Sequence, residues 1–90
     1  MDEHDICLPQ AVWARYGLPP QVRCSGATVR AALDDLCDRL PEVSAYVRAP
    51  DRTVPRSTLI FADGYRVINI DDTALPSARE LTIVIASAGG

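Results

Sequence analysis

The clearest periodic pattern of apolar residues lies between residues 28 and 40. Its members recur at helical spacing: Val29, Leu33, Leu36, Cys37 and Leu40. They share one face of an α-helix, which repeats every 3.6 residues. Thr28 precedes them, where its hydroxyl can accept a hydrogen bond from a free backbone amide. The pattern therefore predicts a main helix that begins at Thr28 and ends before Pro41, which disfavours helical geometry at Leu40.

After the helix, apolar and polar positions alternate as is typical of strands. Residues 58–62 and 65–70 are two β-rich runs separated by Asp63-Gly64, a pair that favours a tight hairpin turn with positive φ at both positions. Residues 81–85 predict a last strand, with Leu81, Ile83 and Ile85 on one side and Thr82 and Val84 on the other. Between helix and hairpin, Val43, Tyr46 and Val47 predict one more helical turn over the core.

The N-terminal part predicts a β-hairpin. Residues 6–16 contain apolar residues interrupted by Pro9, which favours a first strand with a kink or bulge at the proline. Residues 17–20 supply turn chemistry, and residues 21–24 alternate as a short second strand. The acidic leader, residues 1–5, is expected to fray and to leave His4 in solvent.

Together these elements predict an α+β fold in which a mixed sheet of four to five strands packs on one main helix. The chain has 90 residues, which suffices for one core that buries roughly two-thirds of the unfolded surface. We expect one folded domain over residues 1–85 and a flexible C-terminal tail over residues 86–90.

Charge excludes two classes of partner. The chain has 12 acidic residues against 9 basic ones, all arginine, and a net charge of −3. We therefore expect no binding to nucleic acid or to an anionic membrane, because both need a cationic surface. The start is acidic rather than basic, unlike a signal peptide, and the longest uncharged apolar run, residues 81–88, is far shorter than the roughly 20 residues that span a bilayer. We expect a cytoplasmic protein.

Candidate metal and catalytic groups are few. Cys7, Cys24 and Cys37 are odd in number and too widely spaced for a zinc site, so we expect small buried side chains in a reducing compartment. An acidic trio on the helix, Asp34, Asp35 and Asp38, is expected to lie on a solvated face rather than to bind a metal. With one histidine and no glycine-rich phosphate loop, the chain does not look like an enzyme on its own.

The C-terminus is the strongest candidate for chemistry. After the last strand come only small residues: Ala86, Ser87, Ala88, Gly89 and Gly90. Such a tail can thread a narrow channel and lets a reagent approach the backbone closely. The usable group is then the α-carboxylate of Gly90, which adenylation with ATP would activate toward a sulfur nucleophile. The simpler alternative is an inert, disordered end.

Three segments resemble the MoaD/ThiS family of ubiquitin-like sulfur carriers: SGATVRAALDDL (25–36), LIFADGYRV (59–67) and ELTIVIASAGG (80–90). A proline in the first strand and a long connection after the helix look most like the CysO branch. The resemblance implies a β-grasp fold and a covalent thiocarboxylate on Gly90, with no permanently bound cofactor. It also implies an E1-like adenylating enzyme of the MoeB/ThiF type, which uses ATP, and a sulfur-accepting biosynthetic enzyme. A metalloprotease is a further candidate partner.

In that family the adenylating partner is expected to dock on the exposed sheet face and the tail, so Val84 and Thr82 become candidate interface residues. The destination of the sulfur stays open between cysteine, a cofactor and a natural product. Two other functions also stay open: an interaction module whose tail is inert, and a modifier that conjugates through Gly90. Since the chain has no lysine, it cannot receive an isopeptide bond on a side chain.

Overall fold

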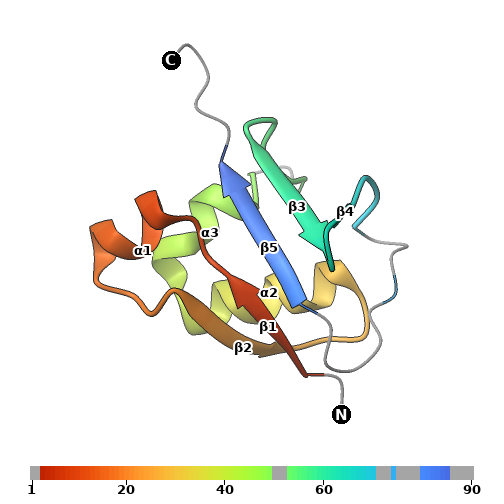
Figure 1. Cartoon of the computed structure of the whole chain (residues 1–90), viewed down its shortest axis with the longest axis horizontal. Helices are drawn as coiled ribbons and strands as arrows, with labels where there is room; N and C mark the ends of the chain where they lie inside the picture. The colour runs from red at the N-terminus through yellow and green to blue at the C-terminus, as the bar shows by residue number, and fades with distance from the viewer. Residues whose placement is uncertain (1–2, 50–52, 71–73, 75–79, 86–90) are drawn as a thin grey trace.

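A computed structural model describes residues 3–49, 53–70, 74 and 80–85. One five-stranded sheet has the order β2-β1-β5-β3-β4, in which β1 and β5 run parallel and the other neighbours run antiparallel. The long helix lies across one face of the sheet (Figure 1). The elements in chain order are β1 (Glu3–Cys7), α1 (Gln10–Tyr16), β2 (Gln21–Ser25), α2 (Val29–Arg39), α3 (Pro41–Val47), β3 (Thr58–Ala62), β4 (Tyr65–Arg66) and β5 (Glu80–Ile85).

The predicted main helix is confirmed as α2. The Thr28 hydroxyl oxygen accepts a hydrogen bond from the amide of Ala31 at 3.2 Å and caps the helix start. The predicted apolar face packs on the sheet, and Pro41 occupies the first turn of α3, the predicted extra helical segment. The buried core consists of Ile6, Leu8, Val12, Cys24, Val29, Ala32, Leu33, Leu36, Cys37, Val43, Val47, Ile60, Ala62, Leu81 and Ile83.

The N-terminal prediction was right about pairing and wrong about the connection. Strands β1 and β2 pair antiparallel, but the first strand ends at Cys7 and α1 follows it in place of a kinked strand. Pro9 lies in the extended conformation before α1, and Gly17 ends the helix in the left-handed region at φ 66°. The side chain of Val12 is buried in the core. A short apolar run with a proline is compatible with either strand or helix; here the amides of Val12 and Trp13 both donate to the Pro9 carbonyl at the start of α1.

The expectation of a frayed leader with a solvated histidine was also wrong. Strand β1 begins at Glu3, so His4 lies inside the sheet and is 1% exposed. Its Nε2 atom lies 2.5 Å from the carbonyl oxygen of Gly26. Pairing with β2 directs His4 to the same face as Ile6, because side chains alternate along a strand. The nonlocal partner strand thus places this imidazole in the core.

The Asp63-Gly64 turn is confirmed, with φ of 50° at Asp63 and 88° at Gly64. The strand after it is shorter than predicted: β4 spans two residues, and one further backbone bond runs from the Val67 N–H to the Ile60 carbonyl at 2.8 Å. Residues 68–70 then turn toward α2, where the Arg30 N–H donates to the Ile70 carbonyl at 3.0 Å. This divergence leaves part of the β3 edge uncovered by β4.

Candidate functional site

Strand β5 leads directly to the tail that the sequence analysis predicts as the chemical site. The tail residues Ala86, Ser87, Ala88, Gly89 and Gly90 lie outside the described residues. Strand β5 lies between β1 and β3, and its last residue, Ile85, is paired with Thr58. Thr58 is itself anchored, because its hydroxyl donates to the Tyr46 carbonyl at 2.5 Å. Strand β5 is thus paired with both neighbours up to Thr82 and with β3 alone from Ile83 to Ile85, where the tail begins.

The two faces of β5 differ as the alternation predicts. Leu81 and Ile83 are 0% and 2% exposed and pack toward α2. Val84 is 40% exposed, and Thr82 is partly exposed on the same outer face. The predicted outward orientation of these two candidate interface residues agrees with the structure, whereas their role in partner binding stays a prediction.

Neighbouring strands extend this outer face into a small apolar surface. Leu59 is paired with Val84, and Phe61 is paired with Thr82. We call these four residues the outer patch. Ile60 is 2% exposed and lies in the core, whereas its neighbour Phe61 is partly exposed on the outer face. The register with β5 determines which side Phe61 faces, because Phe61 is paired with Thr82 and paired residues on neighbouring strands point to the same face of the sheet.

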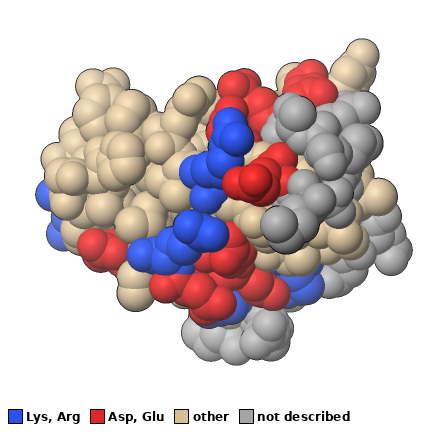
Figure 2. All heavy atoms as spheres, turned by 90° about the horizontal axis from the view of Figure 1, so that it is seen from below, with Lys and Arg blue, Asp and Glu red and all other residues tan. Residues whose placement is uncertain are grey.

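Arginine and acidic side chains are interleaved elsewhere on the surface. Figure 2 shows blue and red side chains in contact with one another on the face seen from below, with no continuous basic area. Two of the ion pairs in the structure are Arg23 with Asp5, at 3.1 Å, and Arg48 with Asp34, also at 3.1 Å.

The acidic trio on α2 is divided between structural roles. The Asp35 carboxylate accepts from the Ser25 N–H at 2.8 Å and from Arg39 at 3.0 Å, and the first of these bonds is the main cause of its lowered pKa. Asp34 pairs with Arg48. Within the described ranges, no group of three His, Cys, Asp or Glu side chains could hold a metal ion.

The thiols do not form a reactive centre. Cys24 and Cys37 are buried and unpaired, as predicted, and Cys7 is partly exposed. Burial raises the pKa of Cys24 to about 11 and also raises that of Cys37. Both thiols therefore stay protonated at neutral pH, and a thiolate is the nucleophilic form. Among the described helices, none is long and apolar enough to cross a membrane.

Several solved structures share this arrangement over nearly the whole chain. SAMP1 from Haloferax volcanii aligns with a TM-score of 0.84 at 22% identity, covering 98% of this chain and 99% of that one. A chain of the Amycolatopsis orientalis BexX/CysO complex aligns with a TM-score of 0.83 at 22% identity, covering 97% and 99%. Mycobacterium tuberculosis CysO aligns at 0.80 and 20% identity, covering 93% and 99%. The chain has the β-grasp fold.

The resemblance to ubiquitin-like sulfur carriers, including CysO, is thus confirmed at the level of the fold. The sequence matches no protein-family model and no curated protein. In this β-grasp domain, β5 carries two residues of the outer patch, Thr82 and Val84, and leads directly into the tail. A partner that contacts Val84 would therefore meet the tail immediately beyond Ile85.

Proposed function

We propose that this protein is a sulfur carrier whose reactive group is the C-terminal carboxylate of Gly90. The observation that carries the proposal is the continuity of β5, in a β-grasp fold shared with CysO, with a sequence that ends in Gly89-Gly90. The chain itself supplies the carrier group, and a partner enzyme supplies the catalytic groups. We assign the adenylation step to an E1-like enzyme of the MoeB/ThiF type.

The chemistry has two steps. A carboxylate oxygen of Gly90 attacks the α-phosphorus of ATP and displaces pyrophosphate, which forms an acyl adenylate. Hydrosulfide then attacks the acyl carbon, the bond from that carbon to the phosphate oxygen breaks, and AMP leaves with the electron pair. Loss of a proton yields the thiocarboxylate, which later donates its sulfur to a biosynthetic acceptor. Neither step changes an oxidation state, so no oxidant or reductant is needed.

The outer patch supports a scheme in which this chain carries the sulfur and a partner enzyme supplies the catalytic groups. Five residues, 86–90, follow β5, and an extended chain of that length reaches at most about 17 Å. A partner can therefore hold the outer patch at Val84 while the carboxylate enters an active site of the partner. The tail side chains do not exceed a methyl or hydroxymethyl group, which suits passage through a narrow channel. The exposed apolar patch gives the partner a surface to bury.

The direct test is a thiolation assay with ATP, a sulfide source and an E1-like enzyme. Intact-mass measurement should show one oxygen replaced by one sulfur, and the modified C-terminal peptide should contain Gly90. Removal of Gly90 should abolish the mass change and leave the thermal melt unchanged. A full-length chain whose mass stays constant, under conditions that thiolate a control carrier, would contradict the proposal.

A second candidate is protein modification through Gly90, and the likeness to small archaeal modifier protein 1 favours it. This function shares the adenylate but transfers the acyl group to an amine of another protein. Because the chain has no lysine, adducts should link Gly90 to a lysine of the target. Mass spectrometry of cell extract separates the two: an isopeptide-linked adduct supports modification, and a thiocarboxylate without adducts supports sulfur transfer. A third reading, an interaction module with an inert tail, predicts partner binding that survives loss of Gly89 and Gly90.

A further inference from the structure

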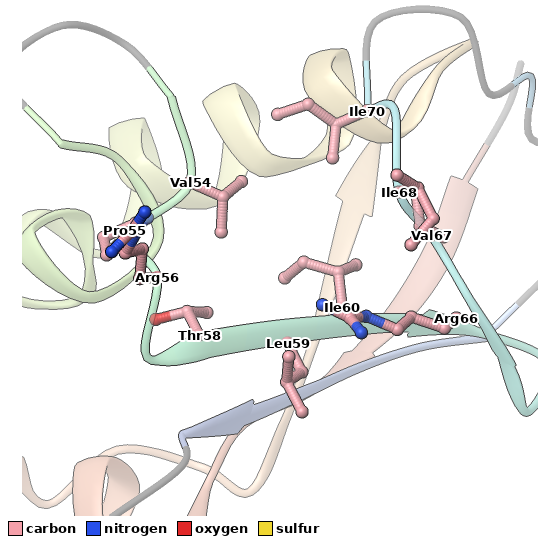
Figure 3. Close-up of a pocket in the computed structure, with 10 residues that line it drawn as sticks. All are labelled: Val54, Pro55, Arg56, Thr58, Leu59, Ile60, Arg66, Val67, Ile68 and Ile70. Carbon is pink, nitrogen blue, oxygen red and sulfur yellow. The ribbon is translucent and has the colours of Figure 1, made fainter. Parts of the chain in front are cut away.

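Thr58, the first residue of β3, is a polar residue at a position that faces the core. It is 6% exposed, and among the residues that the structure describes only His4 is also both polar and buried. In Figure 3 the Thr58 side chain lies on the same side of β3 as Ile60, whereas Leu59 points to the other side. Burial of a hydroxyl costs free energy unless it is hydrogen-bonded. Valine has nearly the same shape and carries no such cost, so the hydroxyl at this position calls for an explanation.

The Thr58 hydroxyl connects β3 to α3. It donates to the carbonyl oxygen of Tyr46 at 2.5 Å, in the last turn of α3, where carbonyls have no partner within the helix. Helix α3 is a firm support, because Val43 and Val47 are 0% and 2% exposed and belong to the core. The Thr58 N–H also donates to the Pro55 carbonyl at 3.0 Å. The start of β3 is thus held through both the side chain and the backbone of Thr58.

The same residue lies opposite the start of the tail. Thr58 is paired with Ile85, the last residue of β5. Strand β1 pairs with β5 only over residues 80–82, so β3 is the one strand neighbour of residues 83–85 among the described segments. The point at which the tail leaves the sheet is therefore held by β3, and at the last pair by Thr58.

This last pair determines how much chain lies between the outer patch and the carboxylate. With Ile85 paired, the five residues 86–90 follow the strand and reach at most about 17 Å. Opening of the pairs at Val84 and Ile85 would extend the reach to about 24 Å. The added length alone would lower the effective concentration of the carboxylate by less than about twofold. The larger effect is on orientation, because the tail would no longer start from a fixed position beside the outer patch.

We infer that Thr58 is a positioning residue for the tail. Its hydroxyl holds the last pair of β5, so that a partner docked on the outer patch meets the Gly90 carboxylate at a defined distance from Val84. Thr58 acts through Ile85 and not on the reacting atoms. The inference rests on the proposed function for the reaction that Thr58 serves, whereas the anchoring of Ile85 can be measured on the protein alone.

The first test is amide hydrogen exchange on the full chain carrying T58V, which removes the hydroxyl and keeps the branched shape. Exchange of the amides that join residues 83–85 to β3 should accelerate at least about fivefold. T58S keeps the hydroxyl and should restore slow exchange. The matched control is T28V, which also removes a threonine hydroxyl bonded to the backbone, here the cap of α2, and should leave these amides unchanged. Urea titration checks that each variant folds, and T58A replaces T58V if T58V does not.

The second test is pyrophosphate release with ATP and an E1-like enzyme. T58V should lower kcat at saturating carrier at least about threefold, while its affinity for the enzyme stays within about twofold of the parent, because the outer patch is unchanged. T58S and T28V should keep the parent kcat. A purely structural role of Thr58 would lower stability in urea and leave kcat unchanged, as expected for T28V.

Three results would overturn the inference: unchanged exchange at residues 83–85 in T58V, an unchanged kcat in T58V, and an equal loss of kcat in T28V. A parent chain that is not adenylated, under conditions that adenylate a control carrier, would contradict the proposed function and with it the reaction that Thr58 serves. The exchange measurement would then still decide whether Thr58 anchors the start of the tail.

Discussion

Val84 offers the sharpest test of the outer patch, because it lies on the strand that leads to the tail and is 40% exposed. Complete burial of a valine side chain is worth about 1.5–3 kcal/mol. Burying the exposed fraction against a partner is therefore worth about 0.6–1.2 kcal/mol. At 1.4 kcal/mol per factor of ten, truncation at this position should weaken partner binding about three- to sevenfold.

The substitutions are V84A and V84D, measured as the affinity of the carrier for an E1-like enzyme and as the KM for the carrier in pyrophosphate release. V84A should raise both constants by the factor given above. V84D should raise them at least about tenfold, because the interface would then bury a carboxylate. The matched control is Y65A, since Tyr65 is 78% exposed on β4 and lies outside the outer patch; its constants should not change.

Stability measurements separate loss of the interface from loss of the fold. V84A should lower the free energy of unfolding by about 1 kcal/mol or less, because much of the side chain is already in solvent. I83A should lower it by about 2–5 kcal/mol, because Ile83 is 2% exposed in the core. Unchanged affinity and KM for V84D, with a normal urea transition, would refute the assignment of this face to partner binding.

Three further predictions concern the fold. G26A should lower the free energy of unfolding by about 1–3 kcal/mol or more in urea titrations, since an added Cβ would lie 2.4 Å from a backbone nitrogen of α2; a loss below 0.5 kcal/mol would contradict this. D35N should be less stable than the parent near neutral pH. Because folding lowers the pKa of Asp35, this difference should persist above its unfolded pKa of about 4 and disappear as pH falls through the folded pKa. Iodoacetamide at pH 8 should alkylate Cys7 in the native chain, whereas Cys24 and Cys37, with burial and raised pKa values, should react only after unfolding, which peptide mapping would show.

Some of the fold followed from short-range patterns alone. The apolar face of α2, its Thr28 cap and the Asp63-Gly64 turn each depend on residues within one or two turns of chain. The same holds for the inward and outward sides of β5, where Leu81 and Val84 separate as the alternation predicts. These features are local because hydrogen bonding and side-chain periodicity within one element determine them.

Other features depended on which segments meet in space. His4 is buried within β1, which pairs with β2, and α1 forms where a kinked strand was predicted, with Val12 packed into the core. The outward side of Phe61 follows from its register with Thr82. Each of these depends on contacts between residues far apart in sequence, and a short apolar run is compatible with either structure or either face.

The candidate functional features can also be divided into those predicted by the sequence and those formed by the tertiary structure. The Gly89-Gly90 end and the absence of lysine are properties of the sequence alone, and they direct attention to the terminal carboxylate. The outer patch exists only because β3 places Leu59 beside Val84. Strand β4 stops after two residues and the following segment turns toward α2, so β4 covers only part of β3. Sequence therefore predicted the reactive group, and tertiary structure decided the surfaces beside it, because a surface is assembled from side chains that only folding brings together.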